Sequence, residues 1–319
     1  MSMVSKMSLW IAIAVLSMGN EGRAAVDTPS RPSDCEAKLC FMEEFYNSDP
    51  LRIKRDLEER KKISTENATR SLRSSNISVT SLEQGCYADG ECIRLMYADR
   101  IYDIYPTWAE LQSDNSAVNL YFKGYMDAVE GLEATFPADR KLKTDSYLER
   151  LVAPEQVLRN LFGKGDLSTE TRLTPKQVKL IRTKLFLEID KRDRKNRTEL
   201  DDLIKRAGFP KQSEYGFDTV KNAFLVVQHS SDIEYQYKKL LDIEENVKIG
   251  EFPERLYALL FDRVQLALTG KQRYGTQFLC RAGKYVVAPL ESPGTVDEIR
   301  SKAGLGLLSQ YAAQLPQGC

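Results

Sequence analysis

The chain has 319 residues, of which 42% are hydrophobic and 29% are charged, a balance that can bury a core and excludes wholesale disorder and fibrous classes. Its length suits one large or two ordinary domains. Its 46 basic residues equal its 46 acidic ones, so no net positive charge favours binding to nucleic acid. The single histidine, His229, excludes sites that require two histidines, such as a His-x-x-x-His zinc site.

The start of the chain has the pattern of a signal peptide. Lys6 precedes an apolar run, Met7–Gly19, which is too short to cross a bilayer, because crossing takes about 20 residues. Small residues at Gly22 and Ala24 predict cleavage after Ala24, so residues 1–24 are expected to be removed. A retained N-terminal anchor is the alternative. We therefore expect a periplasmic or secreted protein without stable membrane insertion after cleavage.

All six cysteines follow the predicted cleavage site, as expected for disulfides in an oxidising compartment. Their spacing favours the pairs Cys35–Cys40, Cys86–Cys92 and Cys280–Cys319. These spacings match no zinc ribbon or finger, so we expect neither a metal site nor a cofactor. Three sequons, at Asn67, Asn76 and Asn196, would be acceptors only in a host that glycosylates exported proteins.

Residues 30–165 are predicted to form a helical N-terminal unit. Charged residues alternate after Pro50, as in a solvated helix, whereas Ser64–Thr80 is rich in serine and threonine and is interpreted as an exposed linker. Apolar residues then recur at helical spacing. The GKGDLS stretch at residues 163–168 is the predicted boundary before a second unit, residues 170–319.

The second unit begins with a strong helix-start signal. Thr174 is a predicted N-cap, followed by a proline at the first helical position and by Gln177 of a capping box. This long helix is expected to end near Gly208, and a later helix at Gly270. Starts of further helices are predicted at Asp218, at Ser231 or Asp232, and at Pro253. With one short strand expected around Val286, the predicted class is mainly α: a helical N-terminal unit plus a C-terminal multi-helix domain with little strand.

Some polar residues are not explained by the helix patterns. Gln228 and His229 directly follow the buried run AFLVV, where a structural role in capping a helix end competes with a ligand-binding or catalytic role. Arg263 falls inside the apolar stripe of its predicted helix, whereas Asp262 is expected to point away from that stripe. An arginine so placed must pair with a carboxylate or line a polar cavity.

The loop after Gly270 offers amides, a phenol and a hydroxyl around a glycine that permits a turn. These residues are Gln272, Tyr274, Gly275, Thr276 and Gln277. The loop could orient a small polar ligand, or it could satisfy backbone groups at a tight turn. Asp193 and Arg197 lie four residues apart on the predicted long helix, a spacing typical of a surface ion pair.

Six motifs occur in a fixed order in the second unit. They are Asp193-x-x-x-Arg197, Gly208-Phe209-Pro210, Gln228-His229, Asp262-Arg263, Gln272-x-Tyr274-Gly275-Thr276-Gln277 and Val296-Asp297-x-x-Arg300-x-x-x-Gly304-Leu305. Together they resemble the bacterial domain of unknown function 6624 family, over roughly residues 175–315. In that family Asp193 is usually followed by glutamine, where this chain has Arg194, and tryptophan is common at Phe209. The resemblance implies site residues but no reaction, and the N-terminal half resembles no known family.

Two functions from different classes fit these residues. The first is a binding module for a small polar ligand, a peptide or a partner protein such as a toxin, which would use Gln228 and the loop residues Gln272, Tyr274, Gly275, Thr276 and Gln277. The second is a hydrolase with His229 as general base, oriented by Asp262, with Arg263 stabilising charge. Convergence of His229, Asp262 and Tyr274 around a pocket would favour the enzyme, and separate packed contacts would favour structural roles.

Overall fold

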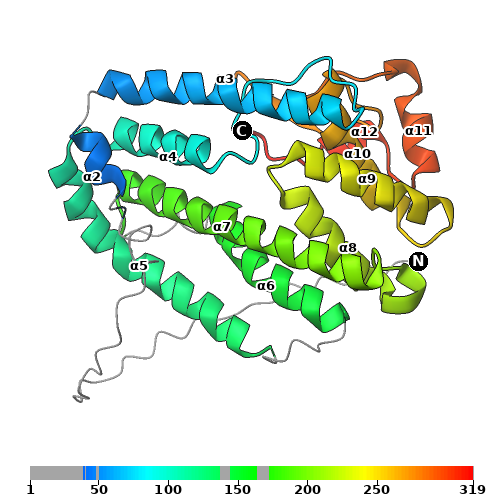
Figure 1. Ribbon diagram of the computed structural model, residues 1–319, viewed down its shortest axis with the longest axis horizontal. Coiled ribbons are helices and arrows are strands. Elements are labelled where there is room, and N and C mark those ends of the chain that lie inside the picture. Colours follow the sequence, from blue (N-terminus) through cyan, green and yellow to red (C-terminus); the bar gives the residue numbers. More distant parts are fainter. Residues whose placement is uncertain (1–38, 40, 48–49, 137–143, 164–171, 319) are drawn as a thin grey trace. The chain divides into compact units, whose positions relative to one another are not determined.

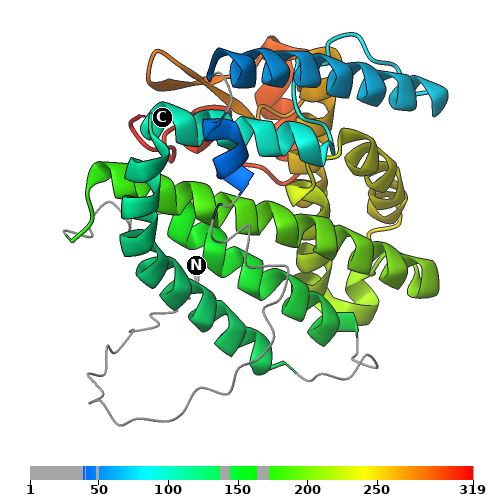
Figure 2. The same cartoon turned by 60° about the vertical axis from the view of Figure 1, so that its left-hand side comes forward.

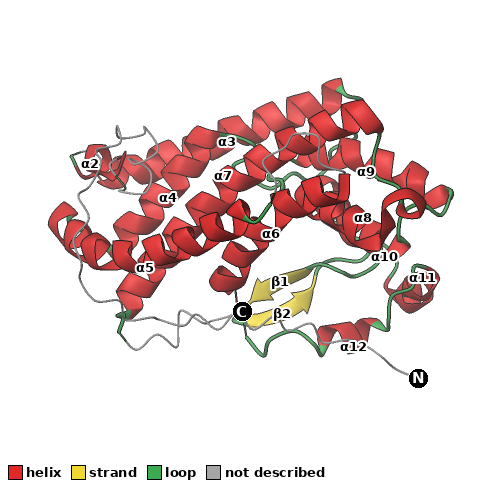
Figure 3. Ribbon diagram, turned by 90° about the horizontal axis from the view of Figure 1, so that it is seen from below, coloured by secondary structure: helices red, strands yellow, loops and turns green. Residues whose placement is uncertain are grey.

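A computed structural model describes residues 39, 41–47, 50–136, 144–163 and 172–318. The described part is mainly α-helical, as predicted, and its strands form one antiparallel hairpin (Figure 3). The predicted domain boundary at residues 163–168 and the predicted signal peptide fall outside the described ranges, apart from Gly163. Within those ranges, no helix is both long enough and apolar enough to span a bilayer.

The first helices pack in two layers beside the long helix α7 (Figure 1). They are α2 (Phe41–Tyr46), α3 (Pro50–Ser74), α4 (Gly90–Ile104), α5 (Trp108–Ala134) and α6 (Thr144–Gly163). Helix α3 lies along α4, and a disulfide between Cys86 and Cys92 joins the loop before α4 to its first turn, confirming one predicted pair. Cys280 is also disulfide-bonded, but its predicted partner Cys319 and the predicted pair Cys35–Cys40 lie outside the described residues.

The expected linker at Ser64–Thr80 is wrong for its first part, because α3 continues to Ser74. Ser64 and Leu72 are buried, and the Ser71 hydroxyl donates to Glu234 of the later helix α9. Packing of one helix face against distant helices stabilises this segment, and that outweighs the modest helix propensity of serine and threonine.

The C-terminal half follows the predicted helix starts at Thr174, Asp232 and Pro253, but not the one at Asp218. It contains α7 (Pro175–Ala207), α8 (Gln212–His229), α9 (Ile233–Lys248) and α10 (Glu254–Thr269). The capping box of Thr174 and Gln177 is present, Asp232 caps α9, and Gly270 ends α10 in the left-handed conformation at φ 74°. Helix α8 begins six residues before the predicted Asp218, although Gly216 interrupts it with non-helical torsions.

The chain ends in short elements that cover α10 and the loop after it. They are β1 (Phe278–Arg281), β2 (Lys284–Val287), the 3-10 turn η2 (Pro293–Thr295), α11 (Val296–Lys302) and α12 (Leu308–Ala312). Phe278 pairs with Val287 and Arg281 with Lys284, so the strand expected around Val286 is confirmed.

Helices α6 and α7 run side by side, in the green part of the ribbon (Figure 2), and two hydrophobic clusters share them. Val152 of α6 and Leu200 of α7 belong to the cluster that α8, α9 and α10 complete. Leu158 of α6 and Ile189 of α7 belong to the cluster formed with α2, α4 and α5. The residues between these positions on α6 and α7 therefore lie at the seam between two apolar cores, which is where the polar residues of the next section occur.

Candidate functional site

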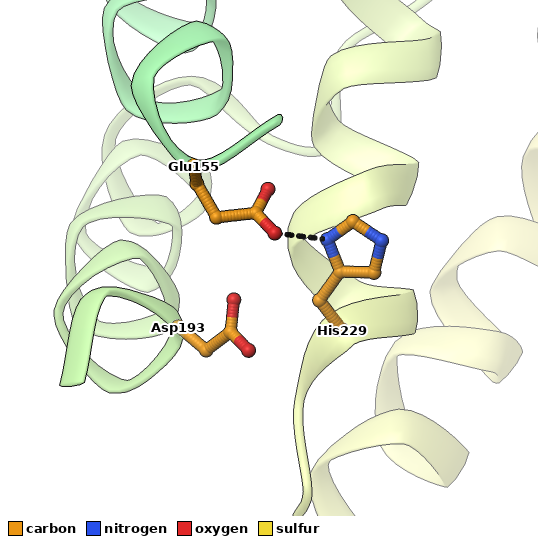
Figure 4. A group of neighbouring side chains, drawn as sticks. All are labelled: Glu155, Asp193 and His229. Atoms are coloured by element: carbon orange, nitrogen blue, oxygen red, sulfur yellow. Dashed lines mark ion pairs between the residues drawn. The ribbon is translucent and has the colours of Figure 1, made fainter. Parts of the chain in front are cut away.

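Three ionisable side chains from three helices meet at this seam (Figure 4). Glu155 comes from α6, Asp193 from α7, and His229 is the last residue of α8. One carboxylate oxygen or ring nitrogen from each lies within 4.8 Å of the others. Glu155 Oε1 is 3.2 Å from His229 Nδ1, and the Glu155 side chain is only 2% exposed. We call these three residues the seam cluster.

The end of α8 is fixed by a side chain of the next helix. Gln236 of α9 is buried, and its Nε2 donates to the backbone oxygens of Val227, Gln228 and Ser230, at 3.3, 3.0 and 2.8 Å. Backbone oxygens at a helix C-terminus lack partners within the helix, and Gln236 supplies donors to them from α9. Gln236 thus holds the backbone on both sides of His229, and the imidazole is presented to α6 from a rigid position.

A proline inside α6 shapes the other side of the cluster. Pro154 has no N–H to donate to the carbonyl one turn before it, and such a residue bends a helix. Close to this break, Asn196 Nδ2 of α7 donates to Leu151 O at 2.9 Å. Asn196, which belongs to one of the sequons, is 7% exposed and so has its amide engaged inside the protein.

Arg159 neutralises both carboxylates of the seam cluster. It forms an ion pair with Glu155, four residues before it on α6, and its Nη2 lies 2.5 Å from Asp193 Oδ2. Gln156 Nε2 donates to the other oxygen of Glu155 at 3.0 Å. A buried carboxylate needs such partners, because an unpaired charge in the interior is costly.

His229 is neutral at physiological pH. Burial and, to a smaller extent, the positive charges of Arg159 and Arg263 together lower the pKa of its imidazole to about 3. An ionised carboxylate can only accept a hydrogen bond, so the short contact with Glu155 favours the tautomer that has its proton on Nδ1 and its lone pair on Nε2. Nε2 points away from both carboxylates (Figure 4) and forms no hydrogen bond with the described residues. The imidazole can therefore accept a proton or bind a donor there.

Asp193 has a raised pKa. Burial raises the pKa of its carboxyl group to about 6, although the charge and hydrogen bond of Arg159 act in the opposite direction. Asp193 is therefore largely ionised at pH 7 but becomes protonated in mildly acidic solution.

The seam cluster has the residue types of a metal site, but it fits a metal ion poorly. Two carboxylates and one histidine are common ligands of divalent cations. Here the guanidinium of Arg159 already pairs with both carboxylates, and a divalent cation between them would be repelled by that charge. The arrangement suits proton transfer or the binding of polar groups better than metal coordination.

The structure corrects the predicted orientations of Asp262 and Arg263. Asp262 is fully buried, and its carboxylate accepts hydrogen bonds from the backbone N–H groups of Arg273, Tyr274 and Thr276, and from the Thr276 hydroxyl, at 2.8–2.9 Å. Arg263 is exposed instead. The loop that folds back over α10 brings four donors to Asp262, which compensates the burial of its charge. Asp262 therefore fastens this loop, while Glu155 is the carboxylate that orients His229.

The loop residues predicted to bind a ligand mainly satisfy one another. Gln272 is fully buried, and its Nε2 donates to the backbone oxygens of Gln277 and Ala288 while its Oε1 accepts from Gln277 N. Gln277 Nε2 donates to Thr276 Oγ1 at 3.1 Å. Gly275 has φ 68°, and a Cβ there would lie 3.0 Å from Leu308 Cδ1. Of the two alternatives for this loop, the contacts favour the tight turn.

Arg300 supports the same loop from α11. It is 1% exposed, and it donates from Nε to Gly306 O at 2.6 Å and from Nη1 to Tyr274 O at 2.7 Å. The half-buried Tyr274 ring packs edge-on against Phe261 and lines a hollow of about 280 Å³ beside Tyr257. Among the predicted site residues, Gln228, His229 and Arg263 are therefore brought together. Asp262 and the loop belong to a different hydrogen-bond network, so His229, Asp262 and Tyr274 do not show the convergence that was expected to favour the enzyme.

Asp193 and Arg197 do not form the expected surface pair. Asp193 binds Arg159, and Arg197 Nη1 lies 3.1 Å from Asp232 Oδ2, beside the N-terminus of α9. Arg194 pairs with Asp190. Two residues four apart on a helix can pair with each other, but each can also pair with a residue of another helix, and tertiary packing decides which pair forms.

The sequence interpretation missed Glu155 and Arg159. The sequence pattern that could have indicated them is a carboxylate and a guanidinium four residues apart on one helix face, next to the apolar residues Val152 and Leu158. Charges inside an apolar stripe are a reason to expect partners from other helices.

Residues 171–318 match the model of a family of unknown function (DUF6624). No curated protein matches the chain, and neither does any solved structure. The matched region contains Asp193, His229 and Arg263, but it begins after Glu155 and Arg159. The seam cluster thus combines family residues with a helix that precedes the family region. The resemblance inferred from the six motifs is confirmed: residues 171–318 match the model of the DUF6624 family, and the N-terminal part of the chain is not recognised.

Proposed function

We propose that the protein binds a small polar molecule beside His229 and hydrolyses it, with His229 as general base. The observation that carries this proposal is the 3.2 Å contact between His229 Nδ1 and the buried carboxylate of Glu155. This contact favours the neutral tautomer with its lone pair on Nε2, the form that removes a proton from water. Glu155 takes the orienting role that the sequence interpretation gave to Asp262.

The arginines near the imidazole supply the positive charge that a hydrolytic site also needs. A negative charge develops on the substrate when water attacks, and fixed cations nearby stabilise it. Arg263 donates from Nη1 to Gln228 O at 3.2 Å, directly before His229 in the chain. Thr276, the only hydroxyl among the motif residues, is engaged by Asp262, so the proposal uses water as the nucleophile.

Binding without chemistry is the second candidate. The observation that favours it is the pKa of His229, about 3, because a general base works best when its pKa lies near the operating pH. On this alternative the same site holds a small polar ligand or a group of a partner protein, and the neutral imidazole acts as a hydrogen-bond acceptor.

Hydrolysis of p-nitrophenyl acetate, phosphate and bis-phosphate esters by the wild type and His229→Gln separates the two candidates. A general base predicts that at least one ester is hydrolysed and that His229→Gln lowers the rate by about 100-fold or more. Lys221→Gln, an exposed position on the same helix, is the matched control. Equal rates for the wild type and His229→Gln would exclude the general base, and wild type inert toward every ester would favour binding alone.

We further propose that the protein is exported and works in the periplasm or outside the cell. The Cys86–Cys92 disulfide and the bonded state of Cys280 support this proposal, since structural disulfides persist in oxidising compartments. Intact-mass measurement of the exported fraction should give a chain that begins at about Ala25. A mass that still includes residues 1–24 would contradict the proposed cleavage.

A further inference from the structure

Arg263 has donors that the described protein does not use. A guanidinium carries five N–H groups, and the structure gives Arg263 a single hydrogen bond, from Nη1 to Gln228 O. No carboxylate of the described residues lies within ion-pair distance of it. The neighbouring arginines differ: Arg159 pairs with Glu155 and Asp193, and Arg197 pairs with Asp232.

Arg263 is exposed to solvent, and its guanidinium also lies close to other groups of the site. Burial among protein atoms and the nearby charge of Arg159 lower its pKa, while the residue as a whole is exposed. An arginine that only served solubility would extend into water, away from other cations. Arg263 instead lies against the end of α8, close enough to His229 for its charge to act on the imidazole.

We propose that Arg263 binds an oxyanion, a phosphate or a carboxylate, of the molecule that reacts beside His229. Oxyanions suit a guanidinium because two parallel N–H groups can bind two of their oxygens. Both carboxylates of the seam cluster are already held by Arg159 on the side of α6 and α7. Arg263, from α10, has no such carboxylate partner among the described residues and has donors left for a ligand.

The bound oxyanion also makes His229 a stronger base. The charged groups that face the imidazole are Glu155 and Arg159 from α6, Asp193 from α7 and Arg263 from α10. Asp232, the N-cap of α9, is held by Arg197. An anion on Arg263 offsets one of the two positive charges that oppose protonation of the imidazole. The pKa of His229 then rises toward its ordinary range once substrate is bound, so that a weak base in the free protein becomes an effective one in the complex.

This inference rests on the proposed function, because it concerns the same site, but its test does not require a turnover substrate. His229 is the only histidine, so an NMR spectrum of protein with ¹³C-labelled histidine shows one Hε1 signal. Sodium phosphate and sodium acetate are each titrated against the protein, with sodium chloride holding the ionic strength constant. We expect a saturable shift of the His229 signal with at least one oxyanion and, in the saturated protein, a rise of its pKa by about one unit or more.

Arg263→Gln should weaken binding of that oxyanion by at least about tenfold, and Arg263→Lys by less, because lysine keeps the charge and loses the paired donors. Arg52→Gln, an exposed arginine at the start of α3, is the matched control and should bind as wild type does. Saturation by phosphate alone or acetate alone identifies which oxyanion the site takes. No saturable shift with either ion, or equal affinity in Arg263→Gln, would overturn the inference. Neither result would change the expected loss of hydrolysis in His229→Gln, so the two proposals fail separately.

Discussion

Glu155 and His229 meet across helices α6 and α8, with Oε1 of the glutamate 3.2 Å from Nδ1 of the imidazole. The pair joins a residue that precedes the family region to the single histidine inside it. Because Glu155 is buried and also pairs with Arg159, the contact is both an orienting device for His229 and part of the packing between α6, α7 and α8.

Loss of the Glu155 carboxylate should be strongly destabilising. Glu155→Ala leaves Arg159 with one carboxylate in place of two, and breaking a buried ion pair typically costs about 3–5 kcal/mol of unfolding free energy. Urea denaturation measures the change. Glu149→Ala, at an exposed position of α6, should change the unfolding free energy by no more than about 0.5 kcal/mol. Similar losses for the two variants would show that the buried network does not stabilise the fold.

The lowered pKa of His229 makes the protein less stable in acid. Between pH 6.5 and about 3 the unfolded chain binds a proton at His229 that the folded protein does not, so this residue contributes a penalty that grows as the pH falls. His229→Gln removes it. Relative to the wild type, the variant should gain about 2–3 kcal/mol between pH 7 and pH 4.5, as measured by urea denaturation.

Asp193 changes the stability in the opposite direction as the pH falls, so the effect of His229 must be measured against a variant that lacks the histidine. With its pKa raised from 3.8 to about 6, the folded protein binds the additional proton in that range and becomes more stable as the pH falls. Asp193 is present in both proteins, so the difference between the wild type and His229→Gln reports the histidine. Lys221→Gln should show the wild-type pH dependence, and a His229→Gln profile parallel to the wild type would contradict the lowered pKa.

Asp262 should prove structural. Asp262→Ala removes the acceptor of four hydrogen bonds and leaves buried N–H groups without partners, with an expected loss of about 3–5 kcal/mol. Hydrogen exchange should accelerate at the amides of Arg273, Tyr274 and Thr276. Glu291→Ala, which removes only an exposed partner of Arg273, should cost about 1 kcal/mol or less. Unchanged exchange in Asp262→Ala would mean that the loop is held by other contacts.

Lys184 should make stability depend on pH in the alkaline range. It is buried on α7, its Nζ donates to Asn115 and Asn119 of α5, and burial lowers its pKa from 10.5 to about 8. Between these values the unfolded chain binds a proton that the folded protein does not, so folding becomes more favourable as the pH rises from 8 to 10.5. The wild type should gain about 3 kcal/mol relative to Lys184→Met over this range. Parallel denaturation profiles for the two proteins would contradict the shift.

The sequence by itself predicted most of the helices and the family. Caps and breakers act locally: the box at Thr174 and the glycine at 270 determine where helices begin and end through hydrogen bonds to residues within one turn. Apolar residues at helical spacing predicted the mainly α class for the same reason, because they report which face of a helix is buried. The expected linker after Ser64 was wrong where a distant helix, α9, provides the contacts that stabilise α3.

Partner choice among the charges was decided only by the tertiary structure. Asp262 and Arg263 are neighbours in sequence, yet one is enclosed by a returning loop and the other stays open to solvent. Periodicity predicted the opposite, because it does not account for a loop that returns over α10 and buries Asp262. His229 was correctly singled out, but its carboxylate partner is Glu155, on a helix that precedes the family region. A buried charge requires a partner within a few ångströms, and spacing along one helix cannot tell which of the other helices supplies it.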